Sequence, residues 1–132
     1  MKKLLFVIIF VNLLFSSIVS IYAQNCDLLY FCVSYDPDAG EIDCSDRFTT
    51  GNITVVALLK SPIFYTKITI QVDKYNPREG TFEYYDAWEF DVDPEMDFIY
   101  FNDINFQDKG FFRVFLVDPE ENIITSGLVE IT

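Results

Sequence analysis

No histidine occurs among the 132 residues of this sequence, so the side chain that most often serves as the base beside a nucleophilic serine or cysteine is missing. Carboxylates are abundant, with 21 Asp and Glu against 9 Lys and Arg. A pair of them could hydrolyse a glycoside if a cleft desolvated one member. Most, however, fall at outward strand positions or in turns, where water solvates them. We therefore expect a protein without catalytic residues, and not an enzyme.

One acidic segment has the composition of a calcium-binding loop. Asp36, Asp38, Asp43 and Asp46 place carboxylates close together along a turn, and calcium takes six to eight oxygen ligands. Gly40 stands where an EF-type loop would have its third ligand, and the distal bidentate glutamate is missing. The segment indicates either a calcium site or plain acidic turns, and no other cofactor is expected.

Three cysteines, Cys26, Cys32 and Cys44, lie close together in the sequence. In an oxidising compartment one disulfide is expected, and the sequence leaves all three pairings open. We favour Cys32–Cys44, because Cys32 lies in a strand-like run and Cys44 follows a turn that could return the chain to it. Without histidine, three cysteines at these spacings do not predict a zinc site.

The first 23 residues have the layout of a secretory signal peptide. Lys2 and Lys3 precede an apolar stretch from Leu4 to Phe15, and Ala23 supplies a small residue at the expected cleavage point. The apolar stretch is shorter than the roughly 20 residues that a membrane span needs. We predict a signal peptide at 1–23, a single domain at 24–132, a secreted or periplasmic location, and no membrane insertion after cleavage.

The net charge of −12 limits the partners that this domain could bind. Its few basic residues form no stripe along the sequence, which argues against nucleic acid. The negative charge also argues against anionic membrane surfaces. It is compatible with a cationic partner or simply with solubility.

The elements that must position any site are strands. Apolar side chains alternate with polar ones in several runs rich in β-branched and aromatic residues, and no helical stripe appears. The expected strands are 28–35, 53–60, 67–73, 88–93, 98–101, 111–117 and 123–131, of which 53–60 is apolar enough to be buried on both sides. All five prolines fall between these runs. This pattern predicts an all-β, antiparallel sandwich of about seven strands.

The segment from Asp108 to Val114 resembles the Asp-x-Gly-x-Tyr-x-Cys run that opens strand F of immunoglobulin-like domains. Phe112 takes the place of the corner tyrosine, and Val114 takes that of the second core cysteine. The resemblance to immunoglobulin-like and fibronectin-type modules implies a β-sandwich fold. It implies no mechanism, because such folds host many functions.

Aromatic residues make up 17% of the chain, more than one core needs. If Phe112, Val114 and Leu116 face the core, then Phe111 and Phe115 face away from it. Either a neighbouring loop covers that face, which we favour, or the face is an interface. Tyrosines cluster around a predicted hairpin at Asn76-Pro77, and the candidate binding surface combines Phe111 and Phe115 with the hairpin residues Tyr75, Tyr84 and Tyr85.

These features predict a non-catalytic binding domain that recognises a protein partner through this surface. One alternative is a carbohydrate-binding module that uses the same tyrosines on an extracellular glycan, with calcium in the acidic loop. Another is an acidic inhibitor of a cationic secreted protein. Self-association through the apolar face, giving a homo-oligomer, is also consistent with the sequence.

Overall fold

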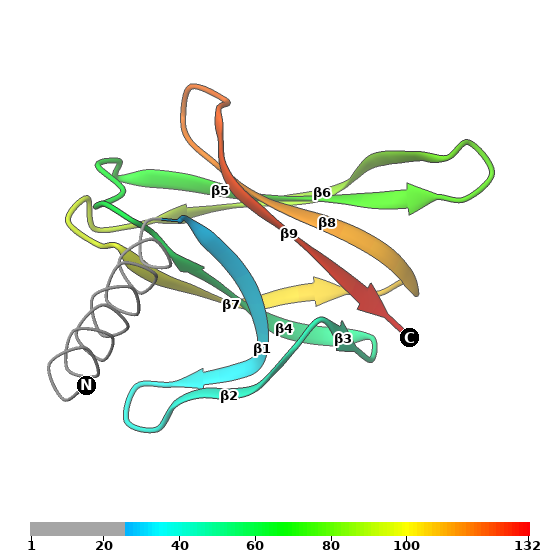
Figure 1. Cartoon of the computed structure of the whole chain (residues 1–132), viewed down its shortest axis with the longest axis horizontal. Coiled ribbons are helices and arrows are strands. Elements are labelled where there is room, and N and C mark those ends of the chain that lie inside the picture. The colour runs from blue at the N-terminus through cyan, green and yellow to red at the C-terminus, as the bar shows by residue number, and fades with distance from the viewer. Residues whose placement is uncertain (1–25) are drawn as a thin grey trace, which may run out of the picture.

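The computed structural model describes residues 26–132, so the predicted signal peptide at 1–23 lies outside the described part. Two sheets are stacked face to face (Figure 1). The four-stranded sheet has the order β2-β1-β4-β7, and the five-stranded sheet has the order β3-β9-β8-β5-β6. The strands are β1 (Leu28–Asp36), β2 (Gly40–Ser45), β3 (Arg47–Phe48), β4 (Gly51–Leu58), β5 (Lys67–Asn76), β6 (Thr81–Asp91), β7 (Phe98–Phe106), β8 (Gly110–Val117) and β9 (Ile123–Ile131). None of these residues forms a membrane-spanning helix.

The strand order is that of an immunoglobulin-like domain. Strands β1, β4 and β7 occupy the places of A, B and E, while β5, β8 and β9 occupy those of C, F and G. All neighbouring strands are antiparallel except β3 and β9, which are parallel. The predicted all-β sandwich of about seven strands is confirmed, with β2 and β3 as shorter additions of six and two residues.

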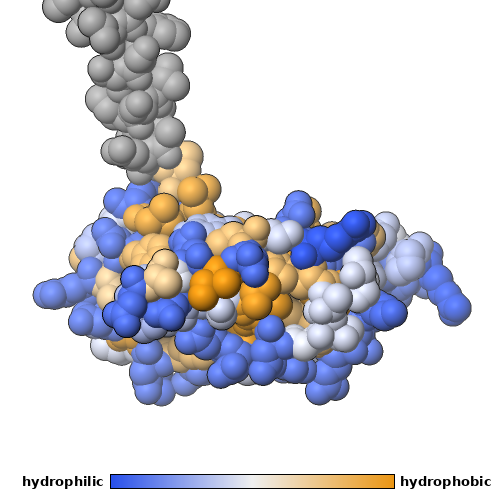
Figure 2. Space-filling model, turned by 90° about the horizontal axis from the view of Figure 1, so that it is seen from below, coloured by the Kyte–Doolittle hydropathy of each residue, from blue (hydrophilic) through white to orange (hydrophobic). Residues whose placement is uncertain are grey.

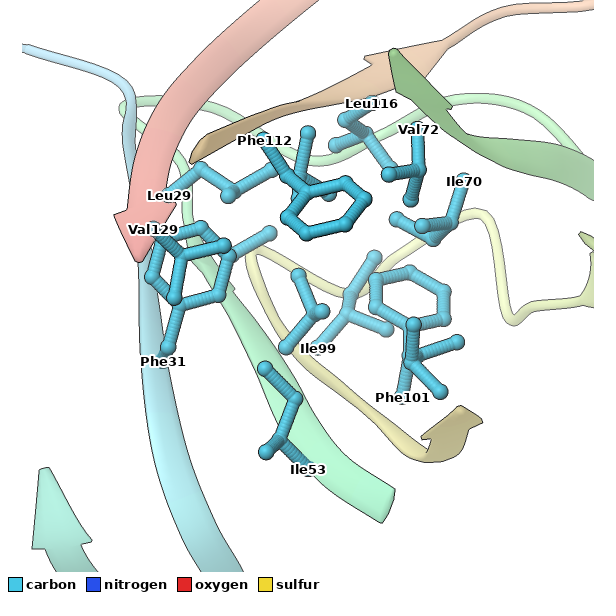
Figure 3. Close-up of a cluster of buried hydrophobic side chains, with 14 of the residues drawn as sticks. Leu29, Phe31, Ile53, Ile70, Val72, Ile99, Phe101, Phe112, Leu116 and Val129 are labelled. Atoms are coloured by element: carbon cyan, nitrogen blue, oxygen red, sulfur yellow. The ribbon is translucent and has the colours of Figure 1, made fainter. Parts of the chain in front are cut away.

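The core fills the space between the two sheets because each strand turns alternate side chains inward. Figure 3 shows both inner faces contributing to one cluster. The labelled side chains are Leu29, Phe31, Ile53, Ile99 and Phe101 from the four-stranded sheet, and Ile70, Val72, Phe112, Leu116 and Val129 from the five-stranded sheet. The five prolines lie between strands, as expected from their missing backbone donor.

Strand β8 has the predicted orientation. Phe112, Val114 and Leu116 are fully buried, and the residues between them face the opposite side of the sheet. Phe112 packs edge-on against Phe106 of the other sheet, with 4.9 Å between ring centroids. The immunoglobulin-like segment therefore has the strand F position that the resemblance implies.

The β1–β2 hairpin turns beneath the four-stranded sheet (Figure 1). The ring of Tyr35 stacks on that of Tyr100 at 4.1 Å, on the face of the sheet that points away from the core. Val56 and Thr54, which share this face, are buried for that reason. The prediction that the run 53–60 is covered on both sides is confirmed from Ile53 to Ala57, whereas Leu58 and Lys60 are exposed. On the face of the molecule seen from below, apolar side chains lie near the centre and hydrophilic side chains surround them (Figure 2).

Candidate binding surface

The outer face of the five-stranded sheet carries a row of exposed and half-buried apolar side chains, which we call the apolar row. It consists of Phe111, Phe115 and Val117 on β8, with Leu128 and Ile123 on β9. The register pairs Arg113 with Leu128 and Val117 with Ile123, so all five side chains share one face. Phe111 is 55% exposed, Leu128 54% and Ile123 61%. The expected cover by a neighbouring loop is therefore wrong for Phe111 within residues 26–132, whereas Phe115 is half-buried.

An open trough of about 670 Å³ continues the apolar row across the sheet. Phe115, Val117 and Ile123 form its apolar side, and polar residues of β5 and of the β8–β9 turn form the rest. These polar residues are Lys67, Thr69, Gln71, Asp73, Asp118 and Glu121, together with Glu89 of β6, and Pro119 lies among them in the turn. The outer face thus combines apolar contact area with a polar border, as the contact surfaces of binding proteins do.

The basic side chains on this face are already engaged within the chain. Lys67 lies 3.1 Å from Glu89 and 3.8 Å from Asp91, and the hydrogen bond to Glu89 is the main reason that its pKa is raised. Arg47 contacts Glu130 at 3.0 Å. Arg113 lies over the ring of Phe82. The border of the apolar row is therefore acidic on balance.

Asp118 at the end of β8 is the one buried acidic side chain in the described part of the chain. Its Oδ1 accepts the backbone N–H groups of Glu120 and Asn122, both at 2.9 Å, and its Oδ2 accepts the hydroxyl of Tyr65 at 3.3 Å. The N–H of Asn122 is the largest cause that lowers the pKa of Asp118 below its usual value. This carboxylate fixes the β8–β9 turn that borders the trough.

We expect Asp118→Asn to lower the melting temperature at neutral pH, because the amide cannot accept these N–H bonds as an anion does. A lowered pKa in the folded state means that the ionised group stabilises the fold above its usual pKa of 3.8. That stabilisation is lost as the pH falls through the folded-state pKa. Thermal unfolding at pH 7 and pH 3 should show that the difference in melting temperature between the variant and the wild type is smaller at pH 3. Asp38→Asn, on an exposed turn, is the control, and a pH-independent difference would contradict this role.

The tyrosine-rich hairpin splits between the two faces of the sheet. Tyr75 is half-buried against Phe82, and Tyr84 is 66% exposed. The register passes from Asp86 to Tyr84 without pairing Tyr85, which marks a bulge in β6. Tyr85 packs edge-on against buried Phe112 at 5.1 Å, and this burial is the main cause that raises its pKa. Tyr85 is therefore half-buried against the core, and its part in a contact surface stays a prediction.

The four predicted calcium ligands are not gathered at one point. Asp36 Oδ1 accepts the backbone N–H groups of Asp38, at 2.8 Å, and Ala39, at 3.3 Å, so it closes the β1–β2 turn. Asp43 lies within β2, and Asp46 follows this strand. Among residues 26–132, only Cys32, Glu41 and Cys44 bring three metal-type ligand atoms within 4.8 Å of one another. Calcium binding by the acidic loop stays a prediction.

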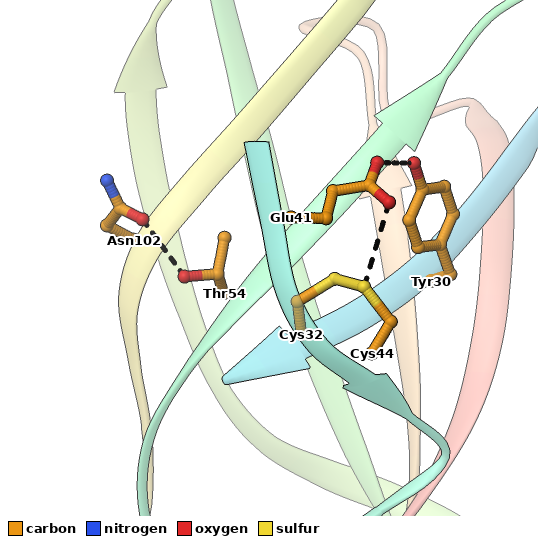
Figure 4. Close-up of a disulfide and its surroundings, with 6 residues drawn as sticks. All are labelled: Tyr30, Cys32, Glu41, Cys44, Thr54 and Asn102. Carbon is orange, nitrogen blue, oxygen red and sulfur yellow. Dashed lines mark hydrogen bonds between the residues drawn. A yellow bond between two sulfur atoms is a disulfide. The ribbon is translucent and has the colours of Figure 1, made fainter. Parts of the chain in front are cut away.

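Cys32 and Cys44 form a disulfide, which confirms the favoured pairing. They are direct partners in the β1–β2 ladder (Figure 4). Cys32 is fully buried, whereas Cys44 and the unpaired Cys26 are exposed. The hydroxyl of Tyr30 donates to Glu41 beside the disulfide, and partial burial, followed by this contact, raises the pKa of Tyr30. The disulfide therefore lies within the hairpin and, unlike the family's core disulfide, does not join the two sheets.

No protein-family model matches this sequence, and no curated protein does. Among solved structures, the chain is similar to an immunoglobulin-like protein of Pseudomonas aeruginosa, with 12% identity and a TM-score of 0.47, over 83% of this chain and 99% of that one. It is also similar to the PmoD soluble domain of Methylocystis sp., with 12% identity and a TM-score of 0.46, over 82% of this chain and 92% of that one.

Proposed function

We propose that this chain is a non-catalytic binding domain that recognises a protein partner through the outer face of its five-stranded sheet. The apolar row carries this proposal. Soluble domains rarely leave several large apolar side chains exposed side by side unless the patch makes contact with something. The disulfide fits an oxidising compartment, which supports a secreted or periplasmic location.

The partner that fits this surface is a protein with an apolar patch and a basic border. Glu130, Glu89 and Asp73 surround the apolar row and the trough, and the basic side chains near them are held in contacts within the chain. The net charge of −12 would speed the approach of a basic partner. The apolar row would then supply most of the affinity, since buried apolar and aromatic anchors dominate binding energy.

The proposal is tested by displaying the exported proteins of the source organism and selecting binders of the mature chain. We expect the double variant Phe111→Ala/Leu128→Ala to weaken the selected binder at least about tenfold, or roughly 1.4 kcal/mol. Val33→Ala is the matched control, because Val33 is 49% exposed but belongs to β1 in the other sheet.

Binders that tolerate the double variant but are lost with Val33→Ala would contradict the proposal and would place the site on the side of the β1–β2 hairpin.

The salt dependence of binding separates this proposal from the acidic-inhibitor alternative. Capture of a cationic protein by charge alone weakens steeply as salt rises, whereas contact through the apolar row persists. A dimeric mass that returns to monomeric in the double variant would identify a second copy as the occupant.

Glycan binding is the second candidate, and the exposure of Tyr84 favours it. The Tyr84 side chain borders a small hollow of about 280 Å³ with Tyr75, Asn76 and Glu83, which offers a ring and polar groups to a sugar. Tyr84→Ala would abolish glycan binding and leave protein binding through the apolar row intact. Tyr85 also lines this hollow, but it is half-buried and its ring packs against Phe112, so Tyr84 offers the more accessible ring.

A further inference from the structure

Strand β6 forms a free edge of the five-stranded sheet. It is the longest strand, with 11 residues, and its only neighbour among residues 26–132 is β5 (Figure 1). A strand of this length without a second neighbour presents unpaired backbone groups, and other extended chains can pair with such groups. The bulge at Tyr85 interrupts this edge, but the stretch from Ala87 to Asp91 is regular and contains neither proline nor lysine, two residues that often block an edge.

The hydrogen-bond alternation shows which backbone groups are free. The N–H of Val92 donates to the carbonyl of Thr66, so the residue just after β6 bonds toward β5. Because alternate residues of an antiparallel strand bond to the same neighbour, the N–H and C=O groups of Asp91, Glu89 and Ala87 point away from β5. The N–H of Ala87 fits this alternation but is not free, since it donates to the Asp86 carboxylate at 2.8 Å. The N–H groups of Glu89 and Asp91 are the ones left for an added strand.

The apolar side chains near this edge are incompletely covered. Trp88 and Phe90 pair with buried Ile70 and Ile68, so they face the core side of the sheet, yet both are only half-buried. The ring of Phe90 lies 4.9 Å from that of Phe101 in the other sheet. A further strand beside β6 would cover both residues with its own inward side chains. The interior of the sandwich would thereby extend by one strand.

Charge determines which chain could pair there. β6 carries four acidic residues, Glu83, Asp86, Glu89 and Asp91, and no basic one. A second copy of β6 would set these acids against each other, and like charges opposite one another are destabilising. Lysine or arginine at alternate positions of an added strand would lie beside Glu89 and Asp91 on the outer face. Its apolar residues would face Trp88 and Phe90.

We infer that the free edge of β6 binds an extended segment of a partner protein in which basic side chains alternate with apolar ones. This edge adjoins the trough through Glu89, but it contains no residue of the apolar row, and the inference does not depend on the proposed function. Backbone pairing supplies affinity, and the alternation supplies selectivity, as in other cases of strand addition.

The test uses the mature chain and two synthetic peptides of equal composition, one alternating lysine with valine and one with the lysines and valines in separate blocks. We expect the alternating peptide to slow amide exchange of Glu89 and Asp91 at least about tenfold, because the new hydrogen bonds must open first. The block peptide should leave both amides unchanged. Equal effects of the two peptides, no protection by either, or protection at the β7 edge instead would overturn the inference.

Variants separate backbone pairing from charge. Ala87→Pro replaces an N–H that donates to the Asp86 carboxylate, and not to the β5 ladder, with a ring that stands in the path of an added strand. Glu89→Lys/Asp91→Lys reverses the charge of the edge, and Glu120→Lys/Glu121→Lys makes the same change in the β8–β9 turn. We expect Ala87→Pro and the edge variant Glu89→Lys/Asp91→Lys each to weaken binding of the alternating peptide about tenfold or more. The turn variant should bind this peptide far more tightly than the edge variant does. Equal losses of affinity for the alternating peptide in the two lysine variants would mean that only net charge matters and would overturn the inference. If Ala87→Pro fails to fold, the lysine pair still decides.

Discussion

Replacing Phe112 with alanine is expected to lower the free energy of unfolding by about 3–5 kcal/mol, the usual cost of emptying a buried phenylalanine site. Phe112 has no exposed surface, and the centroid of its ring lies 4.9 Å from that of Phe106 and 5.1 Å from that of Tyr85. These contacts join both sheets, so the surrounding side chains cannot collapse into the space without moving the sheets together. Urea unfolding of the mature chain, followed by the fluorescence of Trp88, measures the loss.

Phe111→Ala is the matched control for this prediction, because it removes the same atoms from the adjacent position on the opposite face. Phe111 is 55% exposed, so we expect its loss to cost less than about 1 kcal/mol. Equal destabilisation by the two substitutions would mean that Phe111 is covered in solution. A small effect at Phe111 has a second use, since it allows any loss of partner binding in the Phe111 variant to be attributed to contact and not to unfolding.

The fold could be predicted because its local and global requirements agree. Alternation in β8 and β9 places one set of side chains inward and the other outward, and every proline marks a connection. The Asp108–Val114 segment identified strand F before any strand order was known. The β1–β2 hairpin turned beneath the sheet could not be predicted, because the stacking of Tyr35 on Tyr100 joins positions far apart in the sequence.

The candidate site could be predicted in part. The outward direction of Phe111 and Phe115 followed from alternation, but whether a loop covers them depends on packing that no local pattern reveals. Leu128 and Ile123 were missed, although alternation with buried Val129 and Ile131 would have placed Leu128 on the outer face. Tyr84 and Tyr85 were placed on one candidate surface, whereas they lie on opposite faces of β6, as alternation between neighbours requires.

The acidic loop shows why spacing alone does not define a metal site. Asp36 has the residue type that calcium prefers, but its carboxylate is already used to hold the turn by accepting two backbone N–H groups. The sequence shows which residues carry oxygen ligands, but it does not show which of these oxygens already accept hydrogen bonds within the chain. The disulfide prediction was confirmed because it depended on a turn returning the chain, which is a local event.

Removing the Cys32–Cys44 disulfide is expected to lower the free energy of unfolding by about 3 kcal/mol on the chain-entropy estimate for a loop of this length. The two cysteines are 12 residues apart, so the bond closes a short loop of the unfolded chain. Urea unfolding of the oxidised and the reduced mature chain measures the effect, and the Cys32→Ala/Cys44→Ala variant reports it without reductant. Cys26→Ala is the control, since Cys26 is exposed and unpaired.

The loss should begin locally, because the disulfide joins the hairpin that covers the outer face of the four-stranded sheet. Without it, the hairpin is held by its own ladder, by the Tyr30–Glu41 hydrogen bond and by the contacts of the Tyr35 ring with Tyr100 and Phe98. We therefore expect amide exchange to accelerate in β2 and around Val56, while β8 keeps the protection of the global core. Uniform acceleration throughout both sheets would show that the hairpin unfolds only with the whole domain. An unchanged rate in β2 would show that backbone pairing with β1 holds the hairpin without the disulfide.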